Sequence, residues 1–186
     1  MVLGGTTMAK PSSETPSLIL TSPAIQIKDM SEEDLRRTML MLNGLRDSDQ
    51  IPDDCNTKDF HSDICRRHLR QLRLERGRAT YLLSAEPAIC NIYGSLHGGF
   101  VAAAAEFLSI ACARTVVAED KEMFLGELSI SYLSGAPINA EIVVDASIIR
   151  SGRNLTVVTV EFKLQETKKL AYLARSTLYI MPVAKL

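Results

Sequence analysis

One acidic residue, Glu106, lies alone in a long apolar stretch of the chain. It is the only formally charged residue between Glu86 and Arg114, and alanines stand three and four positions before it. A carboxylate in such surroundings is costly to bury unless another group pairs with it or uses it. Buried carboxylates with raised pKa values are common general bases and nucleophiles, so we interpret Glu106 as a candidate catalytic group. Glutamate is also a good helix former, and a place at the wet edge of a helix is the simpler alternative.

A glycine pair opens the same stretch. Gly98 and Gly99 follow His97, and the apolar run continues directly after them. If a helix starts near His97, its first backbone N–H groups have no acceptor within the helix and can bind a developing negative charge. A base and oxyanion donors in one short segment indicate acyl transfer or hydrolysis.

The composition is that of an ordinary globular protein. Of 186 residues, 46% are hydrophobic and 23% are charged, and the formal net charge is −1. This balance favours one domain of about 120–150 residues with additional sequence, and it gives no support for a nucleic-acid or membrane-surface role. The apolar runs are too short for a membrane span. Four cysteines and three histidines show no zinc-ligand spacing, so we expect no metal or other cofactor, and a reducing compartment.

The chain is predicted to have three parts. Residues 1–27, rich in Ser, Thr and Pro, are predicted to be a disordered tail. Residues 28–68 are predicted to be a helical extension, with a capping-box start at Ser31, a helix to about Leu45 and a short helix near residues 58–65. At the other end of the chain, the tripeptide Ala184-Lys185-Leu186 is similar to a peroxisomal address, which predicts the peroxisome with the cytoplasm as the alternative.

The third part, residues 69–186, is predicted to be an α+β domain. A hairpin is expected over Leu69–Leu74 and Arg78–Ser84, and a helix of about 20 residues is expected to start at His97. Strand patterns follow at residues 123–133, 140–150, 155–164 and 170–181. One long apolar helix followed by consecutive strands indicates an antiparallel sheet that wraps around the helix.

The segment Asn91-x2-Gly94-x2-His97-Gly98-Gly99, with an acid eight residues after Gly98, resembles the hotdog-fold acyl-CoA thioesterases. The nearest type is the PaaI-like and 4-hydroxybenzoyl-CoA thioesterase family. The resemblance extends over most of the predicted α+β domain. It implies a hotdog fold, an acyl-CoA substrate, and a homodimer or homotetramer whose sites lie at the dimer interface.

The same resemblance implies a role for each residue of the motif. Asn91 would donate its side-chain amide to the thioester oxygen or position the attacking water; a loop asparagine that only satisfies backbone groups is the alternative. Gly98 would polarise the thioester carbonyl with its backbone N–H, aided by the helix dipole. His97 would shape the turn and contact the substrate. Glu106, from the partner subunit, would activate water as a general base or attack the thioester directly.

Four further residues are candidates for binding the substrate. Gly99 adjoins the oxyanion donor, and Ser109 follows Glu106 by three positions. Arg150 and Arg153 flank a predicted turn, where guanidinium groups can bind the phosphates of coenzyme A.

Two positions depart from the family pattern and leave alternatives open. Ile110 stands one helical turn after the acid, where a hydroxyl commonly holds the water, and Leu125 aligns with a serine of the next strand. A non-catalytic acyl-CoA binding protein is therefore an alternative to the hydrolase. A cluster of six arginines between Arg66 and Arg78 also leaves open a thioesterase that acts on an acyl-carrier protein.

Overall fold

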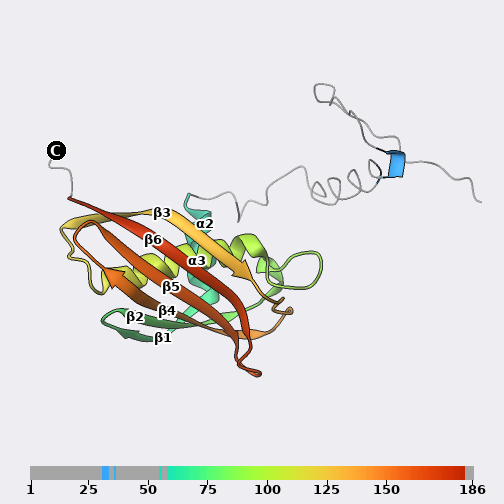
Figure 1. Ribbon diagram of the computed structural model, residues 1–186. Helices are drawn as coiled ribbons and strands as arrows, with labels where there is room; N and C mark the ends of the chain where they lie inside the picture. Colours follow the sequence, from blue (N-terminus) through green and yellow to red (C-terminus); the bar gives the residue numbers. More distant parts are fainter. Residues whose placement is uncertain (1–30, 34–35, 37–54, 56–57, 183–186) are drawn as a thin grey trace, which may run out of the picture. The chain divides into compact units, whose positions relative to one another are not determined.

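The structure is a computed structural model that describes residues 31–33, 36, 55 and 58–182 (Figure 1). The predicted tail (1–27), most of the predicted helix that ends near Leu45, and the C-terminal tripeptide (184–186) lie outside the described residues. The chain divides into two units, Met1–Ile51 and Pro52–Leu186, and the second holds every element discussed below. No helix among the described residues is long and apolar enough to cross a membrane.

The second unit contains a six-stranded sheet in the order β1-β2-β4-β5-β6-β3, with every neighbouring pair antiparallel. The strands are β1 (Leu69–Glu75), β2 (Arg78–Ser84), β3 (Lys121–Tyr132), β4 (Glu141–Ser151), β5 (Leu155–Leu164) and β6 (Leu170–Pro182). The predicted hairpin and the four later strands are confirmed to within two residues at each end. Strands β1 and β3 form the two edges of the sheet.

Helix α3 (Gly98–Arg114) lies along one face of the sheet (Figure 1). It has 17 residues and begins one position after the predicted start at His97. Alanine-rich sequence favours the helical backbone. The side that faces the strands carries Val101, Ala104, Leu108 and Cys112, which recur at helical spacing and have no exposed surface. The predicted α+β hotdog architecture, a sheet wrapped around one apolar helix, is confirmed.

A bulge in β3 directs two leucines toward α3. The pairing of β3 with β6 shifts register between Leu125 and Glu127, which leaves Gly126 without an opposite residue. Side chains of a regular strand alternate between faces, and one extra residue reverses that alternation. Leu125 and Leu128 are three positions apart, and both are partly buried against the core because of the bulge.

Gly126 also makes room for an aromatic ring. Tyr179 of β6 stacks on Phe124, with ring centroids 5.5 Å apart, and it covers the backbone at Gly126. A Cβ atom at that position would lie 2.0 Å from Cε2 of Tyr179. The bulge therefore depends on a residue without a side chain.

Helix α2 (Phe60–His68) packs on α3 and leads directly into β1. It corresponds to the short helix predicted near residues 58–65. Cys65 is its buried residue, with 2% of its surface exposed. The His68 ring meets Phe100 of α3 edge-on, with centroids 6.0 Å apart, and its Nδ1 lies 3.5 Å from a carboxylate oxygen of Glu86. These contacts hold α2 beside the first turns of α3.

The Gly126→Ala substitution is expected to lower the free energy of unfolding by about 1–3 kcal/mol, because the new methyl group collides with the Tyr179 ring. In a Tyr179→Ala background the same change should cost less than about 0.5 kcal/mol. Urea denaturation of the four proteins of this double-mutant cycle measures the coupling. An equal loss in both backgrounds would contradict the assigned contact. Gly135→Ala is a control, since its nearest neighbour is Cβ of Ser95 at 3.7 Å.

Candidate active site

The loop before α3 is held by the side chain of Asn91. Its Oδ1 accepts hydrogen bonds from the backbone N–H of Tyr93 at 3.0 Å and of Ser95 at 3.3 Å, and its Nδ2 donates to Oγ of Ser95 at 3.0 Å. The loop role that the sequence left open beside a catalytic one is thus present in the structure. An amide nitrogen carries two hydrogens, so the bond to Ser95 leaves a second one for a ligand.

The N-terminus of α3 presents one backbone donor more openly than the next. His97 is the N-cap, and its Nδ1 accepts the N–H of Gly99 at 2.9 Å. The N–H of Gly98 stands at the first helical position, where no intrahelical carbonyl can accept from it. The Gly98 amide is therefore left without an acceptor within the helix, whereas the Gly99 amide is engaged by the cap.

Tyr132 at the end of β3 packs against Gly98, the first residue of α3. Its hydroxyl donates to the carbonyl oxygen of Gly98 at 3.0 Å. A Cβ atom on Gly98 would lie 3.3 Å from the Tyr132 ring, tighter than an ordinary contact. The ring, half exposed at 54%, thus packs closely on the first turn of α3, where glycine leaves room for it.

Glu106 is exposed in the single chain, on the side of α3 that the sheet does not cover. The prediction that the Glu106 carboxylate is buried was therefore wrong for the single chain. Some apolar residues near Glu106 in the helix line a cavity, whereas others pack in the core. Eight residues separate Glu106 from Gly98, which is about 12 Å along a helix axis. One thioester carbonyl cannot contact both groups of the same chain at this separation.

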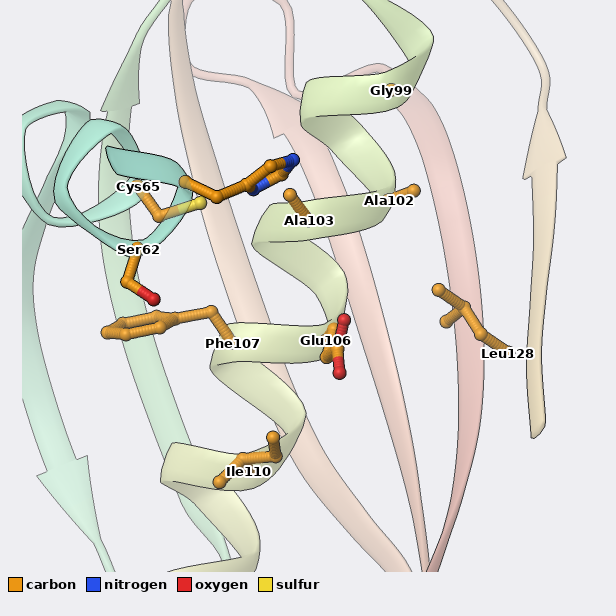
Figure 2. A pocket seen from close by; sticks show the side chains of 10 residues that line it. Ser62, Cys65, Gly99, Ala102, Ala103, Glu106, Phe107, Ile110 and Leu128 are labelled. Carbon is orange, nitrogen blue, oxygen red and sulfur yellow. The ribbon is translucent and has the colours of Figure 1, made fainter. Parts of the chain in front are cut away.

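A cavity of about 530 Å³ adjoins Glu106. Its floor is α3, and its sides are α2 and β3; the lining residues are His61, Ser62, Cys65, Gly99, Ala102, Ala103, Glu106, Phe107, Ile110 and Leu128. Figure 2 shows the Glu106 carboxylate on the flank of α3 nearer Leu128, while Phe107 points to the side of Ser62. Ile110 occupies the wall one turn after the acid. A carboxylate beside a cavity with mainly small and apolar walls can act on a weakly polar ligand.

Ser109 does not join this cavity. Its side chain is fully buried; Oγ donates to the carbonyl oxygen of Ala105 at 2.6 Å and lies 2.8 Å from Oγ of Ser176 on β6. The structure thus places Ser109, which the sequence predicted to bind the substrate, between α3 and the sheet. It cannot replace the hydroxyl missing at Ile110 in the single chain, because it faces the opposite way.

Arg150 and Arg153 are exposed at the β4–β5 turn and lie near the other end of α3. Two hydrogen bonds link β4, two residues before Arg150, to that end of α3 through Gly77. The N–H of Ile148 donates to the carbonyl of Gly77, and the N–H of Gly77 donates to Oγ1 of Thr115 at 2.7 Å. Thr115 caps the C-terminus of α3. Within one chain the two arginines are therefore not brought to the donor at Gly98.

The sequence predicted a short helix near residues 58–65 but did not place its residues at the site. Three of its residues, His61, Ser62 and Cys65, line the cavity beside Glu106. The spacing of apolar residues shows which face of a short helix is buried, but not which element it packs on. Among the described residues, no group of three His, Cys, Asp or Glu side chains is placed to hold a metal ion.

The thiols of Cys65, which lines the cavity, and of Cys112, on the side of α3 that faces the sheet, are poor nucleophiles. Burial raises the pKa of Cys112 to about 11 from an ordinary 9.0. Burial, followed by the nearby negative charge of Glu106, also raises the pKa of Cys65. The thiolate is the reactive form, so both side chains behave as small apolar groups at neutral pH.

Cys112 is expected to resist alkylation in the native protein at about pH 8, since almost none of it is ionised when the pKa is about 11. The half-buried Cys90 should react first, and Cys112 should react readily only after denaturation in urea. Peptide mass spectrometry after timed iodoacetamide treatment gives the order. Equal native rates for Cys112 and Cys90 would contradict the burial described here.

Comparison with known proteins finds similarity over part of the chain. Residues 93–171 match the family model of the thioesterase superfamily. A Caenorhabditis elegans protein provisionally named an esterase, F42H10.6, is 29% identical over 92 residues, which is 50% of this chain and 54% of that protein. The chain thus spans about half the length of this curated relative.

Solved structures share the fold. Zebrafish thioesterase superfamily member 2 has a TM-score of 0.60 and 21% identity, over 78% of this chain and 96% of that one. The protein smu.793 of Streptococcus mutans, solved bound to acetyl CoA, has a TM-score of 0.57 and 20% identity, over 63% of this chain and 91% of that one. The resemblance to hotdog-fold thioesterases that the sequence predicted is confirmed.

Proposed function

We propose that this hotdog-fold chain, whose residues 93–171 match the thioesterase superfamily, is an acyl-CoA thioesterase that releases a carboxylic acid and coenzyme A. The observation that carries the proposal is that one helix holds both an open N-terminal amide, at Gly98, and a carboxylate beside a cavity, Glu106. A solved relative of the same fold binds acetyl CoA, which supports coenzyme A thioesters as the substrate class.

A complete site is proposed to need two copies of the chain. The separation of about 12 Å between Gly98 and Glu106 in one helix is too long for a single carbonyl group. Edge strand β3 pairs with β6 on one side only, and its other side can pair with a second copy. The donor residues Gly98 and Asn91 of one subunit would then meet Glu106 of the other, in a homodimer or in a tetramer of two such dimers.

The reaction at such a site follows from the positions of the groups. The thioester oxygen accepts the Gly98 N–H at the positive end of the α3 dipole, which stabilises charge on that oxygen as the carbonyl is attacked. Glu106 takes a proton from water while the water oxygen bonds to the carbonyl carbon; alternatively the carboxylate attacks and forms a mixed anhydride that water then hydrolyses. The C–S bond breaks, and the coenzyme A thiolate leaves and takes up a proton. His97 holds the turn by accepting the Gly99 N–H.

A second candidate, a non-catalytic acyl-CoA binding protein, is favoured by one observation. Ile110 lines the cavity where the family commonly places a water-holding hydroxyl, and Leu125 is partly buried against the core. Among the described residues that line the cavity, Ser62 of α2 carries the one hydroxyl. Tight binding of acyl-CoA without turnover would favour this candidate over the hydrolase.

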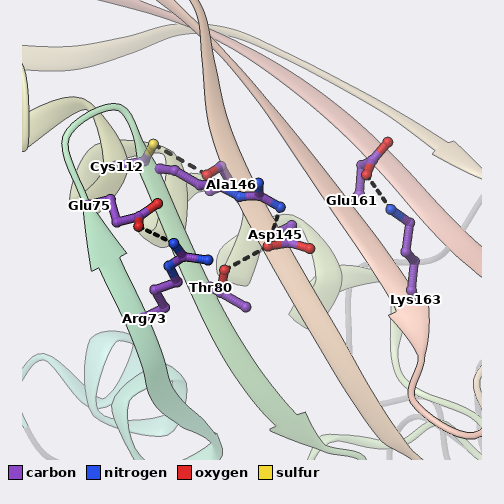
Figure 3. A network of polar contacts seen from close by, with 9 residues as sticks. Arg73, Glu75, Thr80, Cys112, Asp145, Ala146, Glu161 and Lys163 are labelled. Atoms are coloured by element: carbon purple, nitrogen blue, oxygen red, sulfur yellow. Dashed lines mark hydrogen bonds and ion pairs between the residues drawn. The ribbon is translucent and has the colours of Figure 1, made fainter. Parts of the chain in front are cut away.

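The arginine cluster supports a carrier-protein substrate less than its sequence suggests. Arg73 pairs with Glu75 on β1, Arg78 lies 3.3 Å from Asp145 on β4, and Arg66 lies 2.6 Å from Asp63 on α2. Figure 3 shows Arg73 beside Glu75 on β1. Asp145 lies on β4, and β2 runs between these two strands. Pairing on the same surface weakens the positive field that would attract an acidic carrier. Coenzyme A thioesters are therefore the first substrates to test.

The Glu106→Gln variant is expected to lower kcat for acyl-CoA by at least about 100-fold, because the amide cannot accept the proton from water. Free thiol release from a panel of aliphatic and aromatic acyl-CoAs measures the effect. Glu119→Gln, at an exposed turn position outside the cavity, is the matched control and should keep the full rate. A Glu106→Gln enzyme with near wild-type kcat would remove Glu106 from the mechanism.

Mixing two inactive variants tests the shared site. Asn91→Ala and Glu106→Ala are each expected to lose most activity alone. If a site takes Asn91 from one chain and Glu106 from the other, a mixed dimer has one site with both residues intact. Co-expression with two affinity tags, followed by purification of the mixed species, should therefore restore up to about half of the wild-type rate. An inactive mixed dimer would show that each chain holds its own complete site.

A further inference from the structure

Helix α2 closes one side of the Glu106 cavity although it lies outside the segment that matches the thioesterase superfamily. That segment is residues 93–171, whereas α2 is Phe60–His68. Of the ten residues that line the cavity, α2 supplies three, and α3 and β3 supply the others. The cavity thus takes one wall from outside the matching segment, whereas Gly98 and Glu106 lie within it.

This wall is fixed rather than loosely attached. Cys65 is 2% exposed, Ile64 packs against the core, and the His68 ring meets Phe100 of α3 edge-on. No linker separates α2 from β1, since Leu69 is both the C-cap of the helix and the first residue of the strand. A wall held in this way can limit the size of a ligand, because moving it would expose buried apolar surface.

The floor opposite the wall is hollow because its side chains are small. Gly99, Ala102 and Ala103 all line the cavity, with Ala102 on the flank of α3 nearer Leu128 (Figure 2). Figure 2 shows Ala103 across from Cys65, with Phe107 below Ser62. The space between α2 and α3 is therefore a slot with Gly99 at one end and the larger side chains Phe107 and Ile110 at the other.

The charged side chains that line the cavity indicate which ligand charges are compatible with the slot. Glu106 is the one carboxylate of the cavity, on the flank of α3 nearer Leu128, and no lysine or arginine is among the described residues that line the cavity. A polyphosphate or a second carboxylate would be repelled there, whereas an uncharged hydrocarbon chain would bury apolar surface. The volume of about 530 Å³ is within the usual range for a small-molecule site.

We infer that the slot between α2 and α3 holds the uncharged acyl group of the thioester, and that Ser62 and Cys65 of α2 set the length or width of the acyl group that the enzyme accepts. This rests on the proposed thioesterase function and names its substrate class: acyl-CoAs with an uncharged aliphatic or aryl acyl group. Coenzyme A itself lies outside the slot. Ser62 and Cys65 are specificity residues and take no part in the proton transfer.

Two substitutions change the slot in opposite directions. Ser62→Leu fills it, and should lower kcat/KM for the longest acyl-CoA that the wild type accepts by about 10–100-fold, mainly through KM, with little effect on acetyl-CoA. Cys65→Ala enlarges it, and should shift the optimum of a saturated acyl-CoA series toward longer chains. Arg67→Leu, an exposed residue of α2 that does not line the cavity, is the control and should leave the chain-length profile unchanged.

The outcomes separate this inference from the proposed function. Thermal unfolding first establishes that each variant is folded; if Ser62→Leu is not, Cys65→Ala alone decides. Turnover that depends on Glu106, with a chain-length profile unchanged in the slot variants, would overturn the inference and leave the thioesterase intact. If the wild type hydrolyses no member of the series, calorimetric affinities for the same acyl-CoAs replace kcat/KM. Affinities that do not depend on chain length, or that the slot variants leave unchanged, would then overturn the inference.

Discussion

The close packing of α3 on the inner face of the sheet determines where every other part of the site can lie. Val101, Ala104 and Leu108 present no surface to solvent, and the small buried side chains of Ala104 and Ala105 allow the helix to approach the strands closely. Only one side of the helix is covered in this way. The flank that carries Glu106 is left to the edges of the sheet, where α2 continues into β1 and Leu128 projects from β3. The two edge strands are distant in the sheet order, but because the sheet wraps the helix, elements at both edges line one cavity.

The same helix gives Gly98 and Glu106, the two groups proposed to act on the substrate, different electrostatic settings. Gly98 stands at the positive end of the dipole, with its carbonyl fixed by Tyr132, so the donor is preorganised before any ligand binds. Glu106 lies two turns further on, where the dipole contributes little. A rigid helix cannot bring the two together, and no rotamer change spans about 12 Å. Within one helix these two groups therefore cannot contact the same atom of a ligand.

The sequence predicted the strands closely because turn residues such as Ser134, Gly135 and Pro137 interrupt clear strand patterns. It predicted the start of α3 because glycines follow a residue able to cap the helix, as His97 does. It failed at the two points that depend on tertiary packing. The buried environment expected for Glu106 was inferred from neighbours in the chain, which cannot show whether an apolar flank meets the core or a cavity. The placement of α2 rests on contacts between segments more than thirty residues apart, such as His68 with Phe100, which have no local signature.

The attachment of α2 to the sheet explains how this helix can be fixed in place although it lies outside the segment that matches the thioesterase superfamily. Its last residue, His68, is followed at once by β1, whose pairing with β2 is set by register from Leu69 opposite Leu83 to Glu75 opposite Arg78. The position of α2 over α3 is therefore tied to an edge of the sheet and not to a flexible connection. An edge strand can change its side chains without disturbing the central strands that hold α3. The side chains of a helix attached to such a strand can vary in size and polarity while the Gly98 amide and the Glu106 carboxylate keep their geometry.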